Sequence, residues 1–134
     1  MPRNTPLKNS IFRDLDLDFS VHPNSKNLIT LTGDDAVSRS LRNLLQYDHY
    51  EKPFNPDFGS NIRRSLFENF GPQTATTLRN EILQVIANYE PRVEVKDVLV
   101  QPNMDENRYH VVITYYVINE PTLRTATLFL ERLR

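Results

Sequence analysis

Three glutamates are the conceivable acids for acid–base chemistry in this sequence: Glu68, Glu81 and Glu90. A glycosidase needs two facing carboxyl groups, one of them in an apolar pocket that raises its pKa. The sequence places none of the three in a sugar-binding cleft, and it has no tryptophan to stack on a sugar ring. We therefore expect a protein with no catalytic residues.

Metal-binding and other catalytic chemistry finds little support either. The three histidines, His22, His49 and His110, lack the spacing of metal ligands, and there is no cysteine. The aspartates at 14, 16 and 18 have calcium-loop spacing but lack the required glycine and the distal glutamate. With only three glycines there is no glycine-rich phosphate loop, and no serine lies in a nucleophile-elbow motif. We expect no metal and no cofactor.

A charged junction, Tyr89-Glu90-Pro91-Arg92, is more informative. Proline ends a helix because it lacks a donor and clashes one turn back, and here it is flanked by opposite charges. The simple interpretation is a helix stop with two solvated charges. A second unusual stretch, Lys52-Pro53-Phe54-Asn55-Pro56-Asp57-Phe58-Gly59, favours a specific contact instead.

The first half of the chain predicts mostly helices and short extended segments. Residues 1–10 indicate a flexible arm, residues 12–19 an extended segment and residues 27–31 a short strand. Thr32 and Asp35 resemble a capping box in front of a helix with Val37, Leu41, Leu44 and Leu45 at helical spacing.

The next segment is a loop followed by two helices. Residues 53–59 predict a rigid loop in which Phe54 and Phe58 pack on a core. A short helix then runs toward Gly71-Pro72, and the main helix covers about Thr74 to Glu90.

The period changes to two after Arg92, which predicts strands. These cover about Val93–Val100, Tyr109–Ile118 and Thr122–Arg132, and the second is apolar on both faces and so central. The predicted fold class is α+β: a three-stranded antiparallel meander, with or without an extra N-terminal strand, packed against two to three helices. We expect one domain over residues 11–134, preceded by the arm.

Composition excludes several classes of function. The chain has 134 residues and a net charge of −1, and its adjacent arginines, such as Arg63 and Arg64, suit solvated or interface positions better than a nucleic-acid platform. No apolar run approaches the roughly 20 residues that span a bilayer, and no signal-peptide core is visible. We expect a soluble protein that stays in the cytosol where it is made, and no nucleic-acid or membrane partner.

These motifs resemble one known family, the baseplate wedge proteins of contractile-tailed bacteriophages, which also includes a type VI secretion baseplate subunit. The resemblance spans roughly residues 11–133 and rests on four stretches: Phe12-Arg13-Asp14-Leu15-Asp16, residues 53–59, Leu66-Phe67-Glu68-Asn69, and Tyr89-Glu90-Pro91-Arg92-Val93. Many members carry a glycine just before the proline–phenylalanine stretch, where this chain has Asp48-His49-Tyr50-Glu51.

The resemblance implies a structural role in the virion, at the tail baseplate, after assembly in the host cytoplasm. It implies that Glu90, Pro91 and Arg92 dock on the wedge core, and that the C-terminal strands initiate the tail sheath. The partners implied are other baseplate wedge proteins, the tail sheath protein, and hub or tube-proximal proteins. On the third strand, we expect Thr125, Thr127 and Phe129 to receive a sheath strand.

The proline–phenylalanine stretch is a further candidate partner surface. Its members are Pro53, Phe54, Pro56 and Phe58. Two alternatives stay open: a peptidoglycan-cleaving accessory enzyme of the same particle, because the family has been labelled lysozyme-like, and a small adaptor unrelated to tails.

Overall fold

The computed structural model describes residues 13–16 and 18–131. The chain groups into two compact units that divide between Arg39 and Ser40, a boundary that helix α1 (Asp34–Gln46) crosses. The predicted arm over residues 1–10 lies outside the described residues. The single domain expected over residues 11–134 stays a prediction.

The N-terminal unit contains a small antiparallel sheet of two strands. Strand β1 (Arg13–Leu15) pairs with β2 (Thr30–Thr32). The extra N-terminal strand is therefore found as one of a separate pair and does not join the meander. The nearby carboxylates of Asp16 and Asp18 bind Arg39 at 2.6 and 2.9 Å, so this acidic stretch is ion-paired and not merely solvated.

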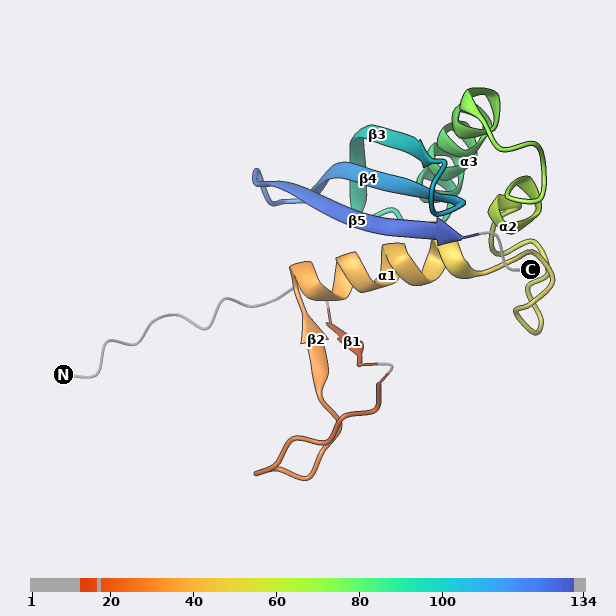
Figure 1. Ribbon diagram of the computed structural model, residues 1–134. Helices are drawn as coiled ribbons and strands as arrows, with labels where there is room; N and C mark the ends of the chain where they lie inside the picture. The colour runs from red at the N-terminus through yellow and green to blue at the C-terminus, as the bar shows by residue number, and fades with distance from the viewer. Residues whose placement is uncertain (1–12, 17, 132–134) are drawn as a thin grey trace. The chain divides into compact units, whose positions relative to one another are not determined.

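The C-terminal unit contains the predicted three-stranded meander (Figure 1). Its strands are β3 (Val93–Asn103), β4 (Arg108–Val117) and β5 (Leu123–Glu131), in the order β3-β4-β5 with antiparallel pairing throughout. Helices α2 (Ile62–Ser65) and α3 (Pro72–Tyr89) precede them. The α+β prediction, with β4 in the centre, is confirmed.

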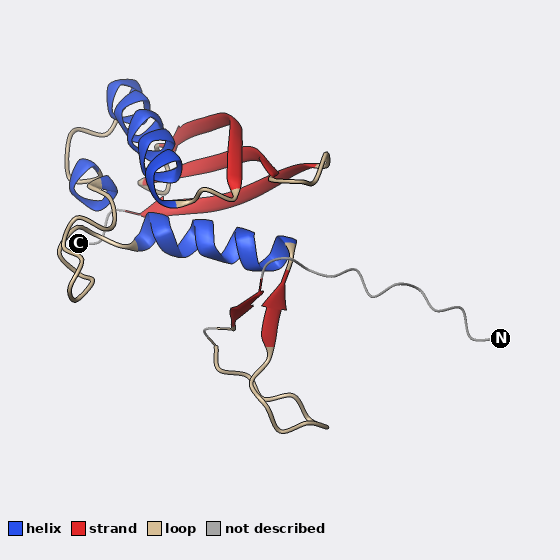
Figure 2. Cartoon of the chain, turned by 180° about the vertical axis from the view of Figure 1, so that it is seen from behind, coloured by secondary structure: helices blue, strands red, loops and turns tan. Residues whose placement is uncertain are grey.

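Strict alternation along β4 and β5 gives the sheet one buried face. On β4 and β5 the buried side chains are Tyr109, Val111, Ile113, Tyr115, Val117, Ala126, Leu128 and Leu130. Helix α3 packs on this sheet and buries a stripe that includes Leu78, Ile82 and Ile86 (Figure 2). The opposite face of the sheet carries the half-buried and exposed residues of each strand.

Two helix boundaries differ from the prediction. Helix α2 ends at Ser65 because the next amides, of Phe67 and Glu68, bond three residues back and tighten the chain. Helix α3 begins at Pro72, two residues early, since proline at the first helical position loses no hydrogen bond.

Candidate protein-docking surfaces

The helix–strand junction is held by a buried carboxylate. Helix α3 ends at Tyr89, and the C=O of Arg92 accepts the N–H of Ile118, which ties the junction to β4. Arg92 donates two hydrogen bonds to Glu90, from Nε to Oε1 at 2.6 Å and from NH2 to Oε2 at 2.8 Å. Only 4% of the Glu90 side chain is exposed, against 24% of Arg92. The structure thus brings the two charges of the junction together in one bidentate pair.

A third residue, Ser40 of α1, completes this clamp. Its hydroxyl donates to Glu90 Oε2 at 2.6 Å. Burial alone would raise the pKa of Glu90, but the hydrogen bonds from Arg92 and Ser40 outweigh it, so the pKa lies below its ordinary value. Sequence reasoning missed Ser40 because it lies 50 residues from Glu90 and no local motif links them.

The edge of β5 is open among the described residues, since no described strand other than β4 pairs with it. Successive residues of an antiparallel strand point their backbone groups alternately to the two sides. The hydrogen bond from Ile118 to Arg92 shows that the backbone groups of even-numbered residues in β4 point toward β3, so those of odd-numbered residues point toward β5. Ile113 pairs with Ala126, and the backbone groups of Ala126 therefore point toward β4. The backbone groups of Thr125 and Thr127 therefore point outward.

The side chains predicted for this edge are exposed, but one of them has intramolecular contacts. Thr125 and Thr127 are exposed. The ring of Phe129 stacks on His110 at 5.1 Å, and the guanidinium of Arg108 lies over it at 4.9 Å. Phe129 is thus pre-positioned on the open face of the sheet.

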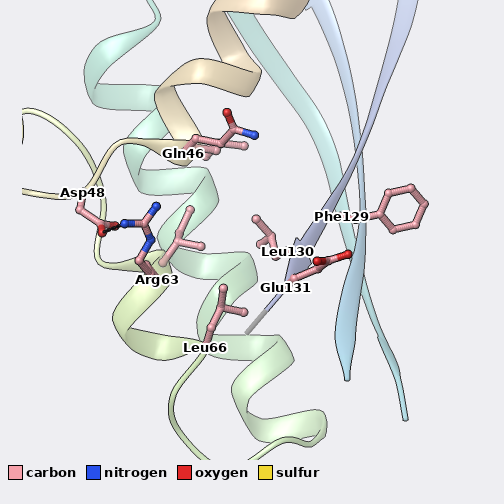
Figure 3. Close-up of a pocket in the computed structure, with 9 residues that line it drawn as sticks. Gln46, Asp48, Arg63, Leu66, Phe129, Leu130 and Glu131 are labelled. Atoms are coloured by element: carbon pink, nitrogen blue, oxygen red, sulfur yellow. Dashed lines mark ion pairs between the residues drawn. The ribbon is translucent and has the colours of Figure 1, made fainter. Parts of the chain in front are cut away.

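A pocket of about 200 Å³ opens beside the end of β5 (Figure 3). Leu66 and Leu130 give it an apolar lining, and the ion pair of Arg63 and Asp48, at 3.1 Å, lies at one side. Phe129 points away from the helices in Figure 3. The pocket therefore combines apolar side chains with charged ones at the end of β5.

The proline–phenylalanine stretch belongs to a loop over residues 47–60 whose backbone is held by hydrogen bonds within the loop. The N–H of Ser60 donates to the C=O of Tyr47 at 3.0 Å, and the N–H of Tyr50 donates to the C=O of Pro56 at 2.9 Å. Gly59 is required here: its φ is +119°, and a Cβ atom would lie 2.8 Å from the backbone of Asp48.

The two phenylalanines of the loop behave differently. Phe58 is half-buried between Tyr47 and Tyr89, with ring centroids at 5.9 and 5.1 Å. The prediction that Phe54 also packs on the core is wrong, because Phe54 is fully exposed. Its backbone has φ +65°, an unusual conformation for a bulky residue. Pro53 and Pro56 are exposed on either side.

Two structural features are absent from the described part of the chain. It contains no cluster of three or more histidine, aspartate or glutamate side chains that could bind a metal ion. Within residues 13–16 and 18–131, no helix has the length and apolarity required to cross a bilayer.

The fold is shared with several solved structures. A protein of Geobacter sulfurreducens named as a candidate tail lysozyme has a TM-score of 0.73 and 23% identity, over 80% of this chain and 97% of that chain. A chain of the anti-feeding prophage baseplate has a TM-score of 0.63 and 21% identity, over 92% of this chain and 87% of that chain. At these identities the likeness concerns the fold alone.

Sequence comparison gives the family. Residues 31–122 match the family described as baseplate wedge protein gp25. The chain is 32% identical to the baseplate wedge protein gp25 of Enterobacteria phage T4 over 113 residues, which are 84% of this chain and 85% of the relative. The chain therefore belongs to the gp25 baseplate wedge family and is a structural component of the baseplate of a contractile phage tail.

Proposed function

We propose that this chain docks on the core of the baseplate wedge through residues 90–92 and initiates the tail sheath by offering the edge of β5 to a strand of a sheath subunit. The observation that carries the proposal is the open edge, with the backbone groups of Thr125 and Thr127 directed outward. An unpaired edge is a liability in a free protein and a binding site in an assembly.

Proline substitution along β5 tests the sheath contact. Thr125→Pro and Thr127→Pro remove outward donors, so the protein should fold, enter baseplates and yield tails without sheath. Ala126→Pro is the matched comparison: it removes a donor that faces β4 and should destabilise the fold. Electron microscopy of tails and thermal unfolding are the two measurements. If the folded variants still nucleate full-length sheath, the edge of β3 becomes the leading candidate.

Substitution of Arg92 tests the wedge contact. Arg92→Ala should abolish incorporation into the wedge, but it also strands the buried carboxylate of Glu90, which costs up to about 3–5 kcal/mol. The double variant Arg92→Ala/Glu90→Gln removes that charge and should restore folding but not incorporation. Incorporation of the folded double variant at the wild-type level would show that Arg92 is not a docking residue.

The same proposal includes hub or tube-proximal proteins as further neighbours. It also holds that the protein has no lytic activity. Glu90 is bound by Arg92 and Ser40 and has a lowered pKa, the opposite of what a general acid needs. The pKa of Glu81 is raised, because burial raises it more than the hydrogen bond from Ser65 lowers it, so Glu81 is the carboxyl group for which the assay below matters most. The name of the T4 relative is that of a structural component.

A turbidity assay on purified cell walls checks this point. The wild-type protein should leave the turbidity unchanged. Clearing that disappears in Glu68→Gln, Glu81→Gln or Glu90→Gln would instead support the alternative, a peptidoglycan-cleaving accessory enzyme.

A further inference from the structure

The loop over residues 47–60 exposes two aromatic side chains from a strained backbone. Phe54 has φ +65° and is fully exposed, and Tyr50 has φ +71° and is 82% exposed. Positive φ is a genuine outlier for bulky residues, and such strain persists only where the surrounding structure enforces it. The loop therefore holds both rings outside at a cost to the stability of the free protein.

The surrounding contacts enforce this conformation. Within the loop, the N–H of Asn55 donates to the C=O of Lys52 and the N–H of Phe58 to the C=O of Asn55. The hydroxyl of Tyr89, at the end of α3, donates to the C=O of Asp57. Gly59 lies so close to the backbone of Asp48 that an added Cβ atom would be only 2.8 Å from it.

These contacts also determine how a partner could recognise the loop. Pro53 and Pro56 have no N–H, and the amides of Tyr50, Asn55 and Phe58 are already bonded within the loop. The loop cannot add to a sheet as a strand, unlike the edge of β5. Recognition must use the side chains, and an exposed aromatic ring on a rigid support fits a preformed apolar cleft.

We infer that Phe54, assisted by Tyr50, inserts into an apolar cleft of another baseplate protein and so forms a contact separate from residues 90–92 and from β5. A protein is favoured over a lipid surface because the loop carries Glu51 and Asp57 beside Lys52, with no cationic excess to attract anionic headgroups. This contact depends only on membership of the baseplate and not on sheath initiation.

The test separates loss of the ring from loss of the fold. Phe54→Gly and Phe54→Asn both remove the ring and both tolerate positive φ. Their thermal midpoint should equal or exceed that of the wild-type protein, while incorporation into baseplates, measured in cells that make the other baseplate proteins, should fall at least about tenfold. Phe54→Leu, which keeps an apolar side chain, should retain more incorporation than either.

Control variants and alternative occupants complete the experiment. Asn107→Gly changes another positive-φ position, φ +51°, that carries no ring, and should incorporate normally. Normal incorporation of both Phe54 variants would overturn the inference, and so would a thermal midpoint several degrees lower in both, since the ring would then stabilise the fold.

Two further readouts test other occupants. Sedimentation of the wild-type protein with phosphatidylethanolamine–phosphatidylglycerol vesicles, lost in Phe54→Gly, would overturn the inference in favour of a lipid surface. A wild-type dimer that becomes monomeric in Phe54→Gly would overturn the inference in favour of a second copy of this chain. Neither a lipid surface nor a second copy as the occupant would change the interpretation of the proline test of β5 or of the Arg92 test.

Discussion

Two proline-containing segments, the junction at residues 90–92 and the loop at residues 47–60, differ in which kind of side chain they bury. At the junction the charged side chain of Glu90 is buried and satisfied by Arg92 and Ser40. In the loop the backbone is satisfied and the apolar ring of Phe54 is left in solvent. The junction thus buries a charged side chain that has partners within the chain, whereas the loop exposes a large apolar one.

The largest expected effect comes from breaking the backbone of the loop. Gly59→Ala should destabilise the protein by about 3 kcal/mol or more, because φ +119° is strained for alanine and its Cβ would meet Asp48 and Tyr47. Urea denaturation measures the change. Gly71→Ala is the matched control, since no atom beyond its two chain neighbours lies within 4 Å of its Cβ position. An equal loss in both variants would mean that close packing at Gly59 does not define the loop.

An intermediate effect is expected at the junction. Glu90→Gln should cost about 1.5–3 kcal/mol at neutral pH, because it removes charge-assisted hydrogen bonds. The pKa of Glu90 is lowered from 4.5 in the folded protein, so its stabilising effect is complete above pH 4.5 and is lost as the pH falls through the folded-state pKa. The difference between wild type and variant should therefore shrink in acid. Glu94→Gln, at an exposed position of β3, is the matched control and should change the free energy of unfolding little at neutral pH.

The smallest effect concerns Tyr89, which touches both segments. It precedes Glu90 in the sequence, and its hydroxyl donates to the C=O of Asp57 in the loop. Tyr89→Phe keeps the ring contact with Phe58 and should cost only about 0.5–1.5 kcal/mol in the free energy of unfolding. Tyr47→Phe, which also keeps its ring contact with Phe58, is the comparison. A smaller loss for Tyr89 than for Tyr47 would show that this hydroxyl does not link the two segments.

The periodic elements could be predicted from the sequence because their signal is local. Alternation along β4 and the apolar stripe on α3 are both set by which residues face the core, and both were found with small errors at the ends. The end of the short α2 was harder to predict. Its apolar residues keep helical spacing, but the chain beyond Ser65 forms turns.

The candidate surfaces were predicted less completely, and the reasons are physical. The pairing of Glu90 with Arg92 follows from their proximity in sequence, but the hydroxyl of Ser40 reaches them only through the tertiary fold. Phe54 and Phe58 have the same side chain and the same prolines nearby. Phe58 packs on Tyr47 and Tyr89 while Phe54, at positive φ, is exposed, and the local sequence does not distinguish the two.

The ladder between β4 and β5 has a mechanical consequence for the proposed sheath contact. Nine register pairs, from Arg108↔Glu131 to Tyr116↔Leu123, hold β5 in place. A force along the strand loads the whole ladder in shear, because the hydrogen bonds lie perpendicular to the strands and must break together. A force at right angles to the strand, within the sheet, opens the same bonds one after another. The direction of pulling, more than the number of bonds, therefore determines how much load this strand can transmit.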